Sequence, residues 1–332
     1  MNRIGLVLVA SLALILVHAS TAAAQDKPDP RFKVGAPIVY ANLTVAPLYS
    51  ASADQPLDDE EYLTLVEATK AKAIEVTELE GNTSDAQVRA VHVTNNSDKA
   101  IFLMAGEVIL GGKQDRIISN TTVIEPGTKQ LEVAVFCVEQ GRWDGRTAEF
   151  QASGKIGHSK LRGRATYDKE QGSVWAEVSA QNKKSKAAPE TDTYKASLKA
   201  AQKNARKYVA HIEPRLAPDK KVLGMVVAID GKPVALDAFA NPRLFGKMRP
   251  ALLESYALEA ATSGGKGKAD VKTLDAFVQE ATTAKKAREA EASGDVLNDY
   301  TESAQTKGSK AMRRSKKSAK KPAVVQESYF AH

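Results

Sequence analysis

The candidate chemistry of this sequence lies in two short polar stretches, each at the end of an apolar, strand-like run. The first spans residues 106–116 and contains the motifs GE and GGKQDR, and the second spans residues 137–143 and reads CVEQGRW. A charged side chain in a run that is expected to be buried costs several kcal/mol unless it has a partner. Such residues therefore have either a structural partner or a ligand. The candidate ligand-binding residues are Glu107, Gln114, Arg116, Glu139, Arg142 and Trp143.

Two functional interpretations suit this set of side chains. The carboxylates and guanidiniums could hold a small anionic or ribose-containing ligand, or a partner protein, with Trp143 as a stacking wall. Glu107 and Glu139 are also the candidate catalytic residues, as general acid and base in the hydrolysis of ADP-ribose-like or glycosidic substrates. The structural alternative is a buried salt-bridge network that locks the first stretch to the second. Spacing alone does not decide between them.

Strand register predicts how these residues meet. If Gly111 and Gly112 form a two-residue hairpin loop, Glu107 faces Arg116 as a cross-strand ion pair. Along the run 131–139 every second side chain shares one face, so Glu139 extends a mostly apolar face. A turn at Gly141 then brings Arg142 and Trp143 close to Glu139.

Other common chemistries lack support in the sequence. Cys137 is the only cysteine, and no histidine spacing suggests a base for it, so we expect a buried core thiol. There is no HxxxH, CxxC or Asp-rich calcium loop, so no metal site is expected. No Walker, GxGxxG or GxSxG motif occurs either, and no cofactor is predicted.

The amino-terminal residues predict export. Residues 1–3 form a short basic start, residues 4–17 an apolar run, and residues 22–24 a small-residue cleavage site, which together are typical of a secretory signal peptide over residues 1–24. The apolar run is shorter than the roughly 20 residues that span a bilayer. We therefore expect a secreted or periplasmic protein, cleaved after Ala24, with no membrane span in the mature chain. Residues 25–33 should form a disordered leader.

Basic charge is concentrated in two segments. The net charge is +7, while residues 155–207 contain 13 basic and 5 acidic residues, and residues 303–326 contain eight basic and no acidic ones. The Lys-rich tail could contact an anionic envelope component or an acidic partner. It lacks interleaved aromatic residues that would stack on bases, which argues against nucleic acid.

The elements that must position the polar stretches are predominantly strands in residues 34–140. Turn residues separate strand-like runs at 38–49, 73–79, 88–94, 101–110, 114–124 and 129–139. One short helix interrupts them, because Thr64 and Glu67 form a capping box. Residues 141–190 are polar and basic, and we expect a long, partly ordered excursion there.

The carboxy-terminal half combines helices with a hairpin. Asp192 can cap a helix, and residues 222–239 predict a hairpin that turns at Asp230-Gly231. A second helix should begin at Asn241-Pro242, completing a helix-hairpin-helix region over 191–262. Residues 263–332 should contain a third helix from about 271 to 290, the Lys-rich segment, and a last strand at 324–330.

These elements predict an α+β fold with a β-sandwich-like amino-terminal half. The carboxy-terminal half should consist of amphipathic helices, a β-hairpin and a terminal strand. One interlocked domain is expected, because the hairpin after residue 222 needs a sheet to join.

A resemblance to a known family adds to this interpretation. The motifs GEVILGGKQDR and VAVFCVEQGRW, together with GMVVAIDGKPVALDAFANPRLF, resemble the ADP-ribosylglycohydrolase and rhodanese-phosphatase associated protein (ARPP) domain. The resemblance covers most of residues 34–262 and departs from the family pattern after Tyr256. The family is uncharacterised, so the resemblance implies a domain identity without an activity. For function we expect an exported binding or scaffold domain, with the hydrolase as the alternative.

Overall fold

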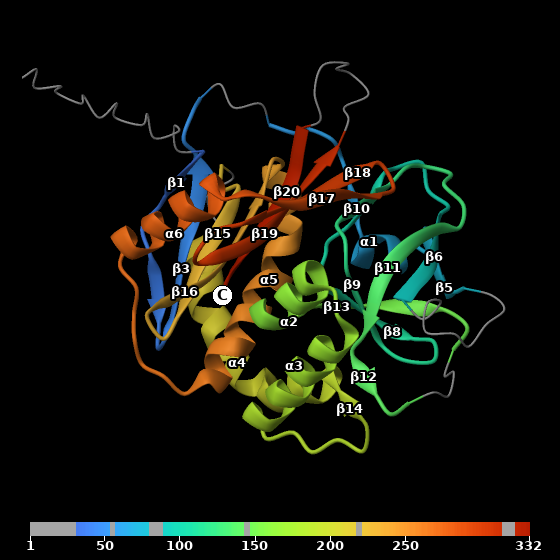
Figure 1. The fold of residues 1–332 in the computed structure, drawn as a ribbon, viewed down its shortest axis with the longest axis horizontal. Coiled ribbons are helices and arrows are strands. Elements are labelled where there is room, and N and C mark those ends of the chain that lie inside the picture. The colour runs from blue at the N-terminus through green and yellow to red at the C-terminus, as the bar shows by residue number, and fades with distance from the viewer. Residues whose placement is uncertain (1–30, 54–56, 80–88, 143–146, 217–220, 314–322) are drawn as a thin grey trace, which may run out of the picture.

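The computed structural model describes residues 31–53, 57–79, 89–142, 147–216, 221–313 and 323–332. The predicted signal peptide, residues 25–30 of the predicted leader, Trp143 and residues 314–322 of the Lys-rich tail lie outside these ranges. The leader was expected to be disordered to residue 33, but Phe32 and Lys33 belong to a strand that pairs in the large sheet. Figure 1 shows an α+β protein in which a large sheet with its helices adjoins a smaller body of strands.

The large sheet joins the two ends of the described chain. Its nine strands run in the order β1-β3-β15-β16-β20-β19-β18-β17, with β2 paired to β3, and all of its pairs are antiparallel. The strands are β1 (Phe32–Val34), β2 (Ile38–Tyr40), β3 (Leu43–Ser50), β15 (Gly224–Ile229), β16 (Lys232–Phe239), β17 (Lys285–Ser293), β18 (Val296–Glu302), β19 (Thr306–Arg313) and β20 (Ala323–Ala331). The hairpin β15-β16 thus joins the sheet through β3, which interlocks the two halves of the chain.

The smaller body is the sandwich-like part of the fold. A six-stranded sheet, β13-β8-β9-β11-β6-β5, packs against a three-stranded sheet, β10-β7-β4, around a shared apolar core. These strands are β4 (Leu63–Thr64), β5 (Ile74–Glu78), β6 (Ala90–Asn95), β7 (Ile101–Leu103), β8 (Glu107–Gly111), β9 (Arg116–Ile118), β10 (Thr122–Ile124), β11 (Leu131–Cys137) and β13 (Phe150–Ile156). The six-stranded sheet curls, because a bridge between Thr77 and Glu149 brings its two edges together.

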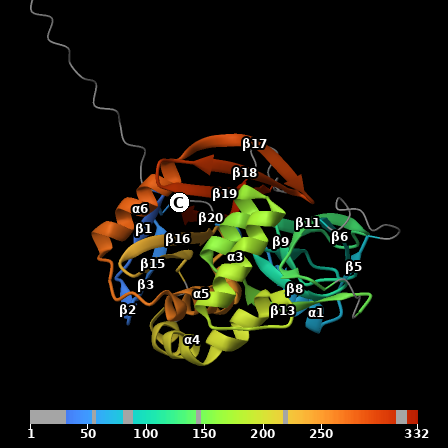
Figure 2. The ribbon, with the colours of Figure 1, turned by 60° about the horizontal axis from the view of Figure 1, so that its bottom comes forward.

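Helices pack on the large sheet and on the six-stranded sheet, as the views in Figures 1 and 2 show. They are α1 (Leu65–Lys70), α2 (Ser159–Gly163), a π-helical turn (Arg164–Asp168), α3 (Gln171–Lys184), α4 (Tyr194–Leu216), α5 (Pro242–Ser263) and α6 (Val271–Thr283). Helices α4 and α5 share an apolar core with one face of the large sheet, and α6 packs on the other face. A short two-stranded sheet, β12 (Glu139–Gln140) with β14 (Asp192–Thr193), joins the smaller body to the start of α4. No helix among the described residues is both long and apolar enough to span a bilayer.

Several local predictions are confirmed. Ile229 pairs with Lys232, and the two turn residues between them have φ of 55° at Asp230 and 81° at Gly231, as a type I′ turn requires. Thr64 and Glu67 form the predicted capping box at the start of α1. The Asn241 side chain caps α5, whose first residue is a proline.

Other local predictions are wrong. The segment expected as a partly ordered excursion contains β13, α2, the π-helical turn and α3, because polar side chains such as Gln181 and Asn182 are buried and hydrogen-bonded in α3. Helix α6 ends at Thr283, and the residues after it form three more strands of the large sheet. Asp192 is a strand residue that accepts a hydrogen bond from Asn182, while the Thr193 hydroxyl accepts one from the Lys195 N–H at the start of α4.

Candidate functional site

The predicted site residues that the structure describes, which exclude Trp143, fall into two places at opposite ends of β8. Glu107 begins this strand and Gly111 ends it, which separates the two places by roughly 13 Å at strand geometry. Ile109, not Glu107, lies opposite Arg116, so the predicted Glu107–Arg116 ion pair is wrong. The loop is wider than two residues because the Asp115 carboxylate accepts the Gly111 N–H at 3.1 Å.

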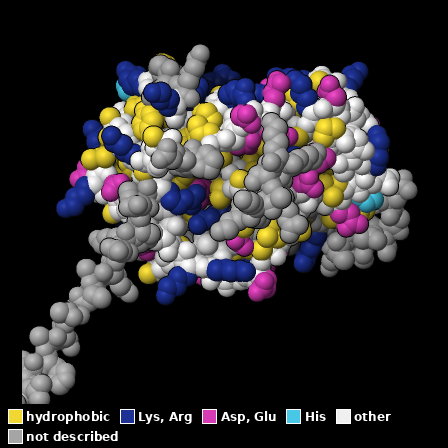
Figure 3. Space-filling model, turned by 90° about the horizontal axis from the view of Figure 1, so that it is seen from above, with side chains coloured by type: hydrophobic (Ala, Val, Ile, Leu, Met, Phe, Trp, Pro, Cys, Tyr) yellow, Lys and Arg dark blue, Asp and Glu magenta, His cyan; other side chains and the backbone are white. Residues whose placement is uncertain are grey.

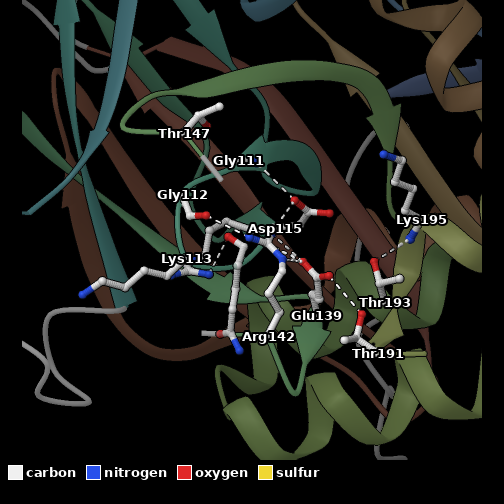
Figure 4. A network of polar contacts seen from close by, with 12 residues as sticks. Gly111, Gly112, Lys113, Asp115, Glu139, Arg142, Thr147, Thr191, Thr193 and Lys195 are labelled. Atoms are coloured by element: carbon white, nitrogen blue, oxygen red, sulfur yellow. Dashed lines mark hydrogen bonds and ion pairs between the residues drawn. The ribbon is translucent and has the colours of Figure 1, made fainter. Parts of the chain in front are cut away.

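At the loop end, Arg142 lies between two carboxylates, as Figure 4 shows. Its Nε donates to Glu139 Oε2 at 2.7 Å, its Nη2 approaches Asp115 Oδ1 at 3.3 Å, and its Nη1 donates to the Gly112 carbonyl at 2.9 Å. The Thr191 hydroxyl donates to the other oxygen of Glu139. The predicted proximity of Glu139 and Arg142 is therefore confirmed, and these contacts lock the β8–β9 loop to the CVEQGRW turn.

This network is buried, and its charges affect one another. Burial raises the pKa of Glu139, but the hydrogen bonds from Arg142 and from the Asp115 N–H outweigh burial and leave that pKa below its ordinary value. Burial raises the pKa of Asp115, and the nearby negative charge of Glu139 adds to this effect. Glu139 is 2% and Arg142 6% exposed, so the pair matches the salt-bridge interpretation of these residues.

We expect Glu139→Gln to lower the free energy of unfolding by about 2 kcal/mol, because a hydrogen bond to a charged partner contributes about that much. The remaining carboxylate, Asp115, limits the loss. Urea denaturation at pH 7 measures it, with Glu132→Gln as the control, since Glu132 is an exposed residue of the neighbouring β11. A change of less than about 0.5 kcal/mol, the range of ordinary surface substitutions, would contradict a structural role for the pair.

Arg116 and Gln114 lie beside this network and are also buried. The Arg116 guanidinium donates to the Gln114 carbonyl at 2.6 Å and approaches Glu78 Oε1 at 3.4 Å. The Gln114 side chain is 1% exposed, and its Oε1 has no hydrogen-bond partner among the described residues. Cys137 lies opposite Arg116 in the ladder, and burial raises the pKa of its thiol.

At the other end of β8, Glu107 closes a tight turn. Its Oε2 accepts the Met104 N–H at 2.7 Å, while its own N–H donates to the Met104 carbonyl at 3.1 Å. The preceding residue must be glycine, because φ is 99° at Gly106 and a Cβ there would lie 2.7 Å from Arg162 Cγ. The GE motif is thus explained by this turn and by the close approach of α2.

Glu107 lines a cleft of about 760 Å³, and four elements supply most of its walls. These elements, α1, β13, α4 and α5, lie beside one another in the lower part of Figure 2. The apolar lining includes Val66, Ile156, Val209, Ala210, Met248 and Ala251. The charged lining consists of Glu67, Glu107, Lys155, Arg206, Lys247 and Glu254.

The charges in this cleft differ in how they are paired. Lys155 Nζ contacts Glu254 at 2.6 Å, and Lys247 Nζ contacts Glu67 at 3.0 Å. Glu107 is 5% exposed and has no cation within ion-pair distance among the described residues. Burial raises the pKa of Glu107 to about 8, and the hydrogen bond from Met104 only partly opposes this. The carboxyl is therefore mostly protonated at neutral pH.

A second buried charge, which the sequence interpretation missed, lies beside this turn. Arg162 Nη2 contacts Asp237 Oδ1 at 2.5 Å, and its Nη1 contacts Asp237 Oδ2 at 3.0 Å. Tyr256 and Ser328 also hydrogen-bond both members of the pair. One signal was available, since Asp237 interrupts an otherwise apolar strand. Its partner lay in the segment 141–190, which was not expected to pack into a core.

Three side-chain contacts of His158 and Ser159 were also not predicted from the sequence. His158 is 1% exposed, and its Nε2 lies 2.9 Å from Glu177 Oε1 while its Nδ1 lies 3.2 Å from the Tyr194 hydroxyl. Ser159 donates to Glu259 at 2.7 Å. These residues hold α2 to α3, α4 and α5 and do not line the cleft. No group of three or more His, Cys, Asp or Glu side chains in the described part of the chain is arranged to hold a metal ion.

Comparison with known proteins gives one match. The model of the ARG and Rhodanese-Phosphatase-superfamily-associated Protein domain, ARPP-1, matches residues 31–330. No curated protein and no solved structure matches the chain. The match extends far beyond Tyr256, where the resemblance was expected to end, and it includes the whole large sheet up to β20. The chain therefore belongs to the ARPP-1 domain family.

Proposed function

We propose that this ARPP-1 domain binds a small anionic or ribose-containing molecule in the cleft beside Glu107. The observation that carries the proposal is a buried carboxyl without a cationic partner among the described residues, placed in the wall of an open cleft. A buried acid in such a place is costly to the fold, and strongly raised carboxyl pKa values concentrate at functional sites. The cleft volume also lies within the range of small-molecule sites, about 300–1,000 Å³.

The chemistry of the lining suggests the class of ligand. A protonated Glu107 can donate a hydrogen bond to a hydroxyl, carbonyl or phosphate oxygen. Arg206 is exposed at the cleft, and Lys155 is held by the partly exposed carboxylate of Glu254, so these two cations can turn to an anionic group. Lys247 is held by Glu67 and also donates to the Tyr62 carbonyl at 2.8 Å. The apolar wall of α4 and α5 would contact the uncharged part of the same molecule.

In this proposal the polar residues of the β8–β9 loop do not bind the ligand and have a structural role. Gln114, Arg116, Glu139 and Arg142 lie at the other end of β8 and set the shape of the β8–β9 loop. A role for Trp143 as a stacking wall remains a prediction. Recognition of a partner protein by the residues of the β8–β9 loop also remains a prediction. We also place the domain outside the cytoplasm, on the strength of the signal-peptide pattern in residues 1–24.

A thermal-shift panel of nucleotides, sugars and anionic glycans at pH 7 tests the proposal. A compound at a hundred times its Kd should raise the free energy of unfolding by about 2.7 kcal/mol. Binding should weaken above pH 8 as Glu107 loses its proton. Glu107→Gln keeps a hydrogen-bond donor and should bind at every pH, whereas Glu107→Ala should not bind.

One control variant accompanies this panel. Glu132→Gln, which changes an exposed carboxylate away from the cleft, should behave as wild type. If no compound stabilises the wild-type protein, or if Glu107→Ala binds as tightly as wild type, the cleft is not the binding site.

A hydrolase of ADP-ribose-like or glycosidic substrates is the second candidate, favoured by the raised pKa of Glu107. A general acid must hold its proton near neutral pH, and Glu107 meets this requirement. Glu139 is not in this cleft; the carboxylates that line it with Glu107 are Glu67 and Glu254. If the domain is a hydrolase, Glu107→Gln should abolish turnover of a bound compound while retaining its binding.

A further inference from the structure

The exposed face of α4 carries a row of five cations, of which only Arg206 lines the cleft. Lys195, Lys199, Lys203, Arg206 and Lys207 are all exposed. At about 100° per residue these five side chains project within an arc of about 120°, opposite the buried side of the helix. Figure 2 shows α4 at the lower edge of the molecule.

The row lacks the acidic residues that normally accompany surface lysines. No Asp or Glu occurs from Tyr194 to Ile212, and none of the five cations lies within ion-pair distance of a carboxylate in the described part of the chain. On the face shown in Figure 3, by contrast, basic and acidic side chains are interspersed. Four of the cations follow one another at i, i+4 spacing, where like charges destabilise a helix. The helix therefore keeps this row at a cost to its own stability.

The dimensions of the row indicate the shape of its partner. Successive cations are about 6 Å apart along the axis, and the row is about 18 Å long at the rise of an α-helix. A single line of positive charges is complementary to a linear, negatively charged polymer rather than to a flat, negatively charged surface. None of the exposed large hydrophobic residues, Leu57, Val271 and Leu297, lies on α4, so the helix offers no apolar side chain for insertion into a bilayer.

The side chains between the cations indicate the chemistry of the partner. The exposed positions between them are small, Ala200 and Asn204, and none is aromatic. Bases would therefore have no ring to stack on, and recognition must rely on repeated negative charge. Lysine binds phosphate as a point charge and needs no fixed geometry. We propose that the exposed face of α4 is a docking surface for a linear chain of phosphate groups.

Inorganic polyphosphate is the probe for this surface. The test variant is Lys199→Glu/Lys203→Glu/Lys207→Glu, because these three residues do not line the cleft. The matched control is Lys266→Glu/Lys268→Glu/Lys272→Glu, which changes the net charge equally on exposed residues around the start of α6. Circular dichroism checks that both variants fold. Ligands of the cleft should bind the test variant normally, so this test and that of the proposed function can fail separately.

The expected result is a loss of polyphosphate affinity of about tenfold or more in the test variant near 0.1 M salt. The slope of log K against log salt should also fall by about 2, since each of three cations contributes about 0.7. The control variant should bind as wild type does. Three results would overturn the proposal: no binding by the wild-type protein, an equal loss in the control variant, or tighter binding to single-stranded DNA or to anionic phospholipid vesicles at equal charge concentration.

Discussion

Replacing Arg162 with alanine is expected to lower the free energy of unfolding by about 3–5 kcal/mol, the usual cost of removing one member of a buried ion pair. Arg162 and Asp237 are both 0% exposed, and their two contacts of 2.5 and 3.0 Å are supported by Tyr256 and Ser328. Burial lowers the pKa of Arg162, but the charge of Asp237 outweighs burial and raises it. Without Arg162, the Asp237 carboxylate would be buried with no counter-charge. The pair also joins α2 to β16, α5 and β20, so its loss affects the packing of α2 against the large sheet and α5.

Urea denaturation at pH 7 measures this effect, with Arg164→Ala as the matched control. The Arg164 side chain is 46% exposed and pairs with Asp168 at the surface, so its removal should cost less than about 1 kcal/mol. The double variant Arg162→Met/Asp237→Leu should recover most of the stability, because apolar side chains of similar size can replace a buried pair. A loss of less than about 1 kcal/mol for Arg162→Ala would show that the buried pair does not hold α2 to the large sheet and α5.

Replacing Glu107 with glutamine is expected to change how stability depends on pH. The folded-state pKa of Glu107 is about 8 and its ordinary value is 4.5, so between these values the folded protein binds a proton that the unfolded chain does not. The stability that depends on this proton is therefore fully present below about pH 4.5 and is lost as the pH rises to 8. At about 1.4 kcal/mol per pKa unit the loss is on the order of 5 kcal/mol. Glutamine has no proton to lose, so this loss should be absent in the variant.

Denaturation at intervals from pH 4.5 to 9 gives the measurement. The difference between the wild-type and variant curves isolates Glu107, because the other titrating groups, including Asp115 and Glu139, are present in both proteins. Glu132→Gln serves again as the control and should follow the wild-type curve. Parallel wild-type and Glu107→Gln curves would mean that Glu107 does not hold a proton in the folded state.

Features that depend on a few neighbouring residues could be predicted from the sequence. The Asp230-Gly231 turn needs only two residues that tolerate positive φ, and the capping box needs only Thr64 and Glu67. The proximity of Glu139 and Arg142 follows from a spacing of three residues across a turn. In each case the deciding interactions lie within a few residues of one another.

The register of β8 and β9 could not be predicted, because it depends on a side chain. A glycine pair suits a two-residue loop, but Asp115 caps the Gly111 N–H and widens the turn. Strand β19 was missed for another reason: its buried positions include Thr306, Ser309 and Arg313, so its sequence shows no apolar alternation. The loop register and strand β19 were both mispredicted because buried polar side chains are stabilised there by partners that the sequence pattern does not show.

The cleft could not be predicted because its lining comes from segments far apart in the sequence. Glu67, Glu107, Lys155, Arg206 and Glu254 belong to five different elements, and no spacing connects them. Glu107 is buried, as expected for a charge in an apolar run. The predicted partner, Arg116, is wrong. The Glu107 carboxyl accepts a hydrogen bond from the Met104 N–H, and Arg116 lies opposite Ile109.

The most direct test of the account is the titration of the Glu107 carboxyl by carbon-13 NMR, with the resonance assigned from its absence in Glu107→Gln. A midpoint near pH 8 is expected in the free protein. A higher midpoint is expected when the most stabilising compound of the thermal-shift panel is bound, because that compound accepts a hydrogen bond from the protonated carboxyl. A midpoint near pH 4.5 that does not move when the compound binds would contradict the account.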